Sequence, residues 1–147
     1  MPLPLEESWA VRKEFVTDPH ILIGRCELLC PADRDLVVAL FGRHGSAELL
    51  AHLGHCHVQT IRRRYRKLLA RLHSERFLLA ARSLPYLSGE QAALARLHIC
   101  QGVSLREAAG RIGLTYHQAR KLLHVIHGVI QNQALLVRKL PMPSHAS

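Results

Sequence analysis

The chain has 147 residues, a formal net charge of +9 and a pI near 10.1. No apolar run approaches the roughly 18 residues of a membrane span, which excludes an integral membrane protein. Acids and prolines in the first nine residues argue against a signal peptide. The positive balance predicts a polyanionic partner, most often nucleic acid. A basic protein whose charge only maintains its solubility is the alternative.

The composition predicts an all-helical protein. Leucine outnumbers valine and isoleucine together, alanine and arginine are plentiful, and glycine and proline fall mainly between periodic segments. Three capping boxes mark helix starts in the second half. In each, a hydroxyl residue precedes Glu or Gln by three positions, so that each side chain can satisfy a free backbone amide. The pairs are Ser88 with Gln91, Ser104 with Glu107, and Thr115 with Gln118.

The last two starts lie very close together. One helix is expected over 105–112, and Gly113 can adopt the left-handed conformation that ends it. A second helix then begins at Tyr116, after a three-residue turn. Two helices joined by a short turn containing glycine form the helix-turn-helix pattern. Ala108 and Ala109 are small where these helices must approach each other.

A resemblance to known families follows from this stretch. The pattern G-x-S-x-x-E-A-A-x-x-I-G-L-T from Gly102, followed by Arg120 and Leu123, resembles region four of bacterial sigma factors and the helix-turn-helix of LuxR-type regulators. The resemblance covers about 87–130 and implies a module that binds promoter DNA. Ala108 and Ala119 replace the larger aliphatic residues usual in those families. An ordinary three-helix packing unit without a DNA role is the alternative.

The first half of the chain carries a weaker copy of the same pattern. At a shift of 58 residues, 29–72 superposes on 87–130, and Ser46, Ala51 and Arg62 fall on identical residues. Gly54 is one position out of step with Gly113, so the first turn is expected to be longer or different.

The predicted fold is therefore all-α, with two tandem helix-turn-helix units of three helices joined by a helical connector. A short amphipathic helix, anchored by Trp9 and Phe15, is expected within the N-terminal segment. The predicted parts are an N-terminal helical segment (1–27), the first unit (28–73), the connector (74–86), the second unit (87–140) and a disordered tail (141–147).

The second helix of each unit carries the candidate binding residues. Its N-terminal residues meet base edges in a helix-turn-helix, whereas flanking basic residues contact phosphates. Gln can bond an adenine edge and Lys can reach guanine, although Gln118 also belongs to a capping box. A solvated basic face is the alternative for the acid-free run 60–71. The base-contacting candidates are His57, Gln59, Thr60, Arg63, Tyr116, His117, Gln118 and Lys121; the phosphate-contacting candidates are Arg62, Arg64, Arg66, Lys67, Thr115 and Arg120.

Metal binding and catalysis have little support in the sequence. The four cysteines are unevenly spaced, and free thiols are expected. No phosphate loop, nucleophile elbow or paired carboxylate set is present. We therefore expect no enzyme, no metal and no cofactor, and structural zinc stays an open alternative. The residues that raise it are Cys26 and Cys30, with His52, His55, Cys56 and His57.

The leading hypothesis is a sequence-specific transcription regulator that binds double-stranded DNA. It would be cytoplasmic and nucleoid-associated, without a membrane partner, and active as a monomer or homodimer. RNA polymerase is a second candidate partner. The alternative hypothesis is a helical protein–protein adaptor, for example one associated with RNA polymerase or a sigma factor. Trp9, Phe15 and the apolar stretch 135–140 would then form its contact patch.

Overall fold

The computed structural model describes residues 19–41 and 46–139. Every regular element in these ranges is helical and none is a strand, which confirms the prediction of an all-α protein. The expected helix at 6–16, its anchors Trp9 and Phe15, and the tail 141–147 lie outside the described residues. The chain divides into two compact units, with the boundary between Ser74 and Glu75.

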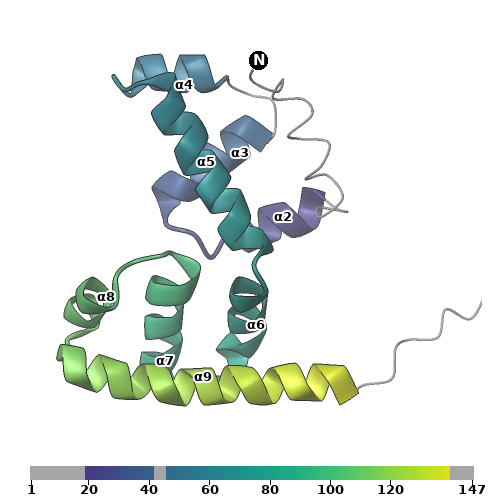
Figure 1. The fold of residues 1–147 in the computed structure, drawn as a ribbon, viewed down its shortest axis with the longest axis vertical. Coiled ribbons are helices and arrows are strands. Elements are labelled where there is room, and N and C mark those ends of the chain that lie inside the picture. Colours follow the sequence, from purple (N-terminus) through teal and green to yellow (C-terminus); the bar gives the residue numbers. More distant parts are fainter. Residues whose placement is uncertain (1–18, 42–45, 140–147) are drawn as a thin grey trace, which may run out of the picture. The chain divides into compact units, whose positions relative to one another are not determined.

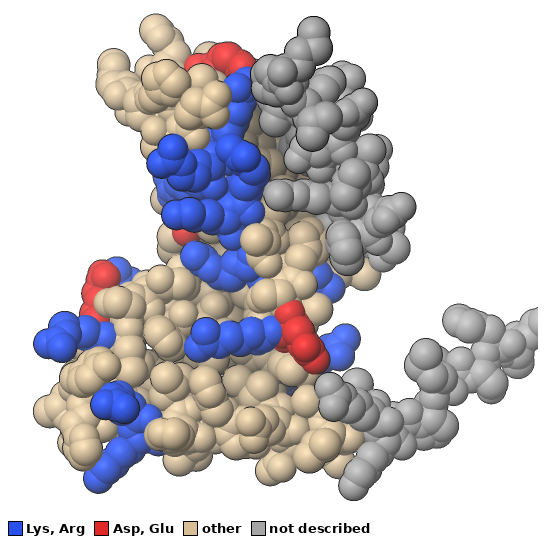
Figure 2. Space-filling view, viewed as in Figure 1, with Lys and Arg blue, Asp and Glu red and all other residues tan. Residues whose placement is uncertain are grey.

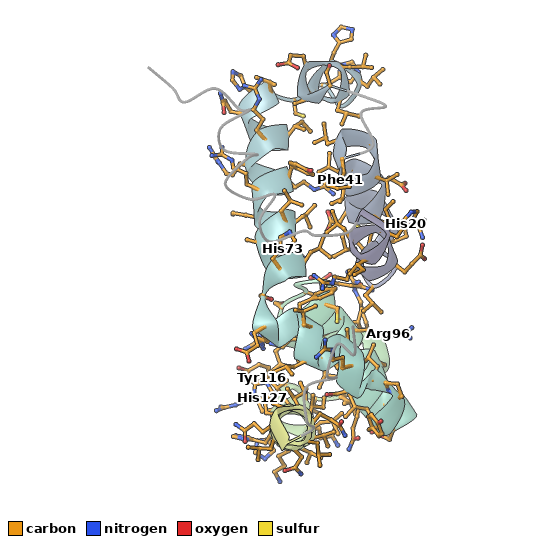
Figure 3. The ribbon with its side chains drawn as sticks, turned by 90° about the vertical axis from the view of Figure 1, so that its right-hand side faces the viewer. His20, Phe41, His73, Arg96, Tyr116 and His127 are labelled. Atoms are coloured by element: carbon orange, nitrogen blue, oxygen red, sulfur yellow. The ribbon has the colours of Figure 1, made fainter. Side chains whose placement is uncertain are left out.

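The first unit contains four helices in its described part. Both α2 and α3 pack against α5, and α4 packs against the N-terminal half of α5 (Figure 1). In Figure 3, α3 ends at Phe41 and runs alongside α5, which ends at His73. The four helices are α2 (Pro19–Cys26), α3 (Pro31–Phe41), α4 (Ala47–Leu53) and α5 (Val58–His73).

Local sequence explains where these helices begin. Pro31 occupies the first position of α3, where its missing N–H is not needed. The Ser46 hydroxyl accepts a hydrogen bond from the Leu49 N–H at 3.1 Å and caps α4. The core then forms from apolar residues that recur every three to four positions. Those on α5 are Ile61, Tyr65, Leu68, Leu69 and Leu72, all buried.

The second unit begins with a helix that the sequence analysis placed in the connector. Phe77 and Ala80 of this helix, α6, are fully buried, and α6 packs against both η2 and α9. It is therefore a core helix of the unit. The elements are α6 (Glu75–Ser83), the 3-10 turn η1 (Leu84–Tyr86), α7 (Gly89–Leu94), the π-helical η2 (Ala95–Cys100), α8 (Leu105–Ile112) and α9 (Tyr116–Lys139).

The predicted caps of the second unit form in the structure. Both hydrogen bonds of the capping box are present for Ser88 with Gln91. They are also present for Thr115 with Gln118, at 2.9 and 3.1 Å. The Ser104 hydroxyl accepts from Glu107 N–H at 3.2 Å, but the Glu107 carboxylate binds Arg111 instead of completing its box.

A widened helical turn leads from α7 towards α8. Over η2 the backbone hydrogen bonds follow the π-helical pattern, which spans five residues instead of four, and the Gln101 N–H donates to the Arg96 carbonyl at 2.8 Å. Ile99 and Cys100 are buried here, and the His98 ring bonds the Val103 carbonyl through Nδ1 at 2.8 Å. This hydrogen bond fixes the loop that connects η2 to α8.

The two units repeat the same helix order at a shift of 58 residues. Helices start at Pro31 and Gly89, at Ala47 and Leu105, and at Val58 and Tyr116. The pairs of elements in contact also correspond, because α2, α3 and α4 each contact α5 as α6, α7 and α8 each contact α9. The correspondence extends to α2 and α6, beyond the span found in the sequence.

The two turns also correspond bond for bond. Cys56 N–H binds the Ala51 carbonyl at 3.0 Å, and Leu114 N–H binds the Ala109 carbonyl at 2.9 Å. The left-handed residue is His55 in the first unit (φ 51°) and Gly113 in the second (φ 77°). The expectation of a longer or different first turn is therefore wrong, because His55, not Gly54, takes the left-handed position.

Candidate nucleic-acid interface

Helical geometry separates the arginines of α5 into two groups. Successive residues are about 100° apart around a helix. Ile61 and Tyr65 mark the buried side of α5. Arg62 and Arg64 lie at the two borders of this buried side, towards neighbouring helices. Arg63 lies on the opposite, solvent side, because it is about half a turn away from that stripe.

The Arg64 side chain is engaged by α3. Its Nε and Nη2 atoms both donate to Asp33 Oδ1, at 3.0 and 2.6 Å. The Asp33 side chain is only 15% exposed, whereas that of Arg64 is 46% exposed. Charge-assisted contacts of this kind are stronger than neutral hydrogen bonds. Arg64 thus fastens α3 to α5.

Arg62 is engaged in the same way by α4. Its Nη2 atom lies 2.6 Å from Glu48 Oε1. Glu48 and Asp33 lie 14 and 31 residues before their arginines, so the acid-free sequence run gives no sign of either pair. Two of the predicted phosphate-contacting arginines are therefore neutralised within the unit.

The solvent side of α5 forms what we call the α5 outer face. In Figure 2 the basic atoms of the first unit gather over α5. In the described part of the chain, no salt bridge joins Arg63, Arg66 or Lys67 to a carboxylate. The exposed polar members of this face are Gln59, Thr60, Arg63, Arg66 and Lys67.

His57 has a structural task at the start of α5. Its Nδ1 atom accepts a hydrogen bond from the Gln59 N–H at 3.1 Å, so His57 is the N-cap of the helix. Thr115 is the equivalent cap of α9. Both caps were predicted as DNA-contacting residues, and in both the capping atom is already engaged.

The start of α9 presents an aromatic ring with two arginines close to it. Tyr116 is 43% exposed. The Arg106 Cζ atom lies 5.0 Å from the ring centre and the Arg120 Cζ atom lies 6.0 Å from it, within cation–π range. The sequence analysis missed Arg106, because it lies on α8 and not on the second helix.

Of the other α9 residues predicted to contact bases, one takes part in the helix cap and two are exposed at the surface. The Gln118 side-chain oxygen accepts from Thr115 N–H, so the carbonyl needed for a bidentate adenine contact is engaged. His117 and Lys121 are exposed and lie on the side opposite the buried Ala119 and Ile126. They form the accessible polar surface of the first turns.

A histidine cluster lies further along α9. Partial burial lowers the pKa of His127 below its ordinary value of 6.5, with further lowering by the charges of Arg76, His124 and His98. Figure 3 shows Tyr116 and His127 on this helix, which is seen there end-on. The neutral imidazole is therefore favoured at position 127.

The cysteines are free thiols, and the thiol of Cys26 is buried. Burial, followed by the charge of Glu27, raises the pKa of Cys26. Among the described residues, no three His, Cys, Asp or Glu side chains gather as metal ligands would. The six residues that raised the question of zinc lie on α2, before α3, on α4 and in the turn that follows it.

Comparisons with known proteins add no relative. No family model, no curated protein and no solved structure matches the chain. None of the described helices combines the length and apolar character that crossing a bilayer requires.

Proposed function

We propose that this protein is a transcription regulator that binds double-stranded DNA through two tandem helix-turn-helix units. The observation that carries the proposal is the α5 outer face, where Arg63, Arg66 and Lys67 form no salt bridge with any carboxylate of the residues that the structure describes. Uncompensated cations along one helix face are the electrostatic footprint of a phosphate-binding surface.

The repeated turn supports the helix-turn-helix interpretation. In each unit a short helix is capped by serine, a left-handed residue follows, and a longer helix then packs against the short one. In a helix-turn-helix the second helix enters the major groove with its N-terminal residues against base edges. In this proposal α5 and α9 are the two recognition helices.

The proposed contacts follow from exposure and chemistry. Arg63, Arg66 and Lys67 contact phosphates and provide affinity that is independent of sequence. Gln59 and Thr60 on α5 reach base edges, as do His117 and Lys121 on α9, because these exposed side chains lie in the first two turns. We assign Arg62 and Arg64 to the folding of the first unit instead.

The experiment is selection from a random duplex DNA pool across a salt series. We expect an enriched motif with two half-sites, and an affinity that falls steeply with salt. Substituting glutamine for Arg63, Arg66 and Lys67 together should reduce the slope of log affinity against log salt by about three. Arg64→Gln is the matched control: it should lower the melting temperature and leave the salt slope nearly unchanged.

Two outcomes would contradict the proposal. Retention without an enriched motif would reduce the protein to a non-specific phosphate binder. No retention even at low salt would exclude DNA as the partner.

A protein-contact role is the second candidate, and exposed apolar residues favour it. Leu49 and Leu53 on α4 are 49% and 66% exposed and lie one turn apart. Leu135 and Leu136 on α9 are also exposed. An adaptor, for example one that contacts RNA polymerase, would keep its partner after loss of Arg63, Arg66 and Lys67. Such an adaptor would bind DNA little or not at all, and substituting serine for Leu49 and Leu53 would release its protein partner.

A further inference from the structure

The two units place different charges at one equivalent position beside the turn. At the shift of 58 residues, Glu48 on α4 corresponds to Arg106 on α8, and Arg62 on α5 corresponds to Arg120 on α9. In the first unit the two side chains meet in a salt bridge of 2.6 Å. That bridge shows that side chains at these positions reach each other across the packed helices.

In the second unit the two equivalent positions both carry cations, and both cations lie near one aromatic ring. Arg106 and Arg120 both lie within 6.0 Å of the centre of the Tyr116 ring. Within the described ranges, neither arginine forms a salt bridge, and Glu107, the acid next to Arg106, is bound to Arg111 at 2.6 Å. The position that holds an anion in the first unit therefore holds a second cation here.

The aromatic ring explains how this arrangement persists without an anion. The face of a tyrosine ring carries partial negative charge, which attracts guanidinium groups and offsets part of their mutual repulsion. The equivalent residue in the first unit is Val58, which has no such ring. Tyr116 thus lies beside two forked hydrogen-bond donors at the molecular surface, and their N–H groups can donate to an anionic ligand.

We propose that Arg106, Arg120 and Tyr116 form a phosphate-binding site. Guanidinium groups match the geometry of phosphate oxygens and can bond them in pairs. A phosphate between the arginines would take the electrostatic place that the Glu48 carboxylate takes beside Arg62. The source of this phosphate is the DNA backbone next to the groove that α9 enters, so this assignment rests on the proposed function.

The test compares Arg106→Gln with Arg111→Gln in the full chain. Both remove one arginine from α8, but Arg111 is already paired with Glu107. Arg106→Gln should reduce the salt slope of duplex binding by about one, and Arg106→Glu by about two, because a glutamate at position 106 also neutralises Arg120. Arg111→Gln should leave the slope unchanged.

The melting temperature separates loss of binding from loss of folding. Arg106→Glu recreates the charge pair of the first unit, so we expect a melting temperature at or above that of the wild type. An unchanged salt slope in this variant, with the fold intact, would overturn the site.

A titration with inorganic phosphate tests the site independently of DNA. Nuclear magnetic resonance of the arginine Nε–H groups should show Arg106 and Arg120 shifting together in the wild type, and no shift of Arg120 in Arg106→Glu. If the wild type binds no duplex, the proposed function fails and this titration alone decides the site. Arg106 and Arg120 resonances could shift with phosphate while Arg106→Gln leaves the salt slope of duplex binding unchanged. That result would overturn the DNA backbone as the source of the phosphate.

Discussion

The two units share one backbone frame but use their charged side chains in opposite ways. In the first unit, carboxylates on α3 and α4 neutralise Arg64 and Arg62 at the borders of the core. In the second unit, Arg106 and Arg120 both lie near Tyr116, and neither forms a salt bridge within the described part of the chain. The frame therefore does not depend on these ion pairs, since the second unit forms it without them.

The cores also differ at the point where the short and long helices meet. Ala108 and Ala119 are fully buried in the second unit, and the equivalent residues of the first unit are Leu50 and Ile61. The buried contact between the short and long helices is therefore made with smaller side chains in the second unit than in the first. The common features are the caps and the left-handed turn, and these define the repeat.

Exchanging the core residues between units should have the largest effect. Ile61→Ala leaves a cavity beneath α4 and should lower the free energy of unfolding of the first unit by about 2–4 kcal/mol. Ala119→Ile forces a larger side chain into a filled contact and should destabilise the second unit by about 1–3 kcal/mol. Hydrogen exchange followed by mass spectrometry measures α5 and α9 separately in one experiment.

The controls for this exchange use smaller changes at the same positions. Ile61→Val should cost about 1 kcal/mol, and Ala119→Ser should change packing volume very little. If the amides of α9 were as protected from exchange in Ala119→Ile as in the wild type, the contact between α8 and α9 would have room for the larger side chain. The difference between the two cores would then carry no consequence for stability.

Exchanging the left-handed residues between the units should change the free energy of unfolding by a smaller amount. The change should be destabilising in the second unit and stabilising in the first. Gly113→Ala places a side chain at φ 77° and should cost about 1 kcal/mol; nothing lies within 4 Å of the new Cβ, so the cost is backbone strain alone. His55→Gly relieves the same strain in the first unit and should stabilise it by about 0.5 kcal/mol. Thermal unfolding followed by circular dichroism measures both, and a stabilising Gly113→Ala would contradict the assignment of this turn.

Local signals in the sequence were enough to locate the starts of α7, α8 and α9. Ser88, Ser104 and Thr115 cap the helices they were expected to cap, and Gly113 ends α8 in the left-handed conformation. These signals act within four residues, so they are visible in sequence. The first turn was misjudged because glycine was taken as the marker of the left-handed position, and His55 occupies it without one.

Tertiary features of the candidate site were outside the reach of sequence reasoning. The pairing of Arg64 with Asp33 spans 31 residues and depends on how α3 packs against α5. Arg106 approaches Tyr116 only because α8 packs against α9. The shift of 58 residues did contain a usable signal, since it aligns Arg106 with Glu48. That signal has meaning only once the salt bridge of the first unit is known.

Acidification should weaken the second unit and leave the first nearly unchanged, and this is the smallest expected effect. The residue equivalent to His127 is the buried Leu69, which does not titrate. The pKa of His127 is lowered in the folded chain by partial burial and by Arg76, His124 and His98. As pH falls through about 6.5, the imidazole at position 127 is protonated in the unfolded chain before it is protonated in the folded chain. Its contribution to the free energy of unfolding is therefore fully present above that pH and is lost below it.

The measurement is amide protection of α6 and α9 between pH 7.5 and 5, corrected for the intrinsic pH dependence of exchange. We expect protection to fall in the wild type and to fall less in His127→Leu, which copies the first unit at this position. His117→Gln, on the outward side of α9, is the control and should follow the wild type. An equal fall in α5 would show that the acid response is not confined to the second unit. The response would then have to come from a group other than His127.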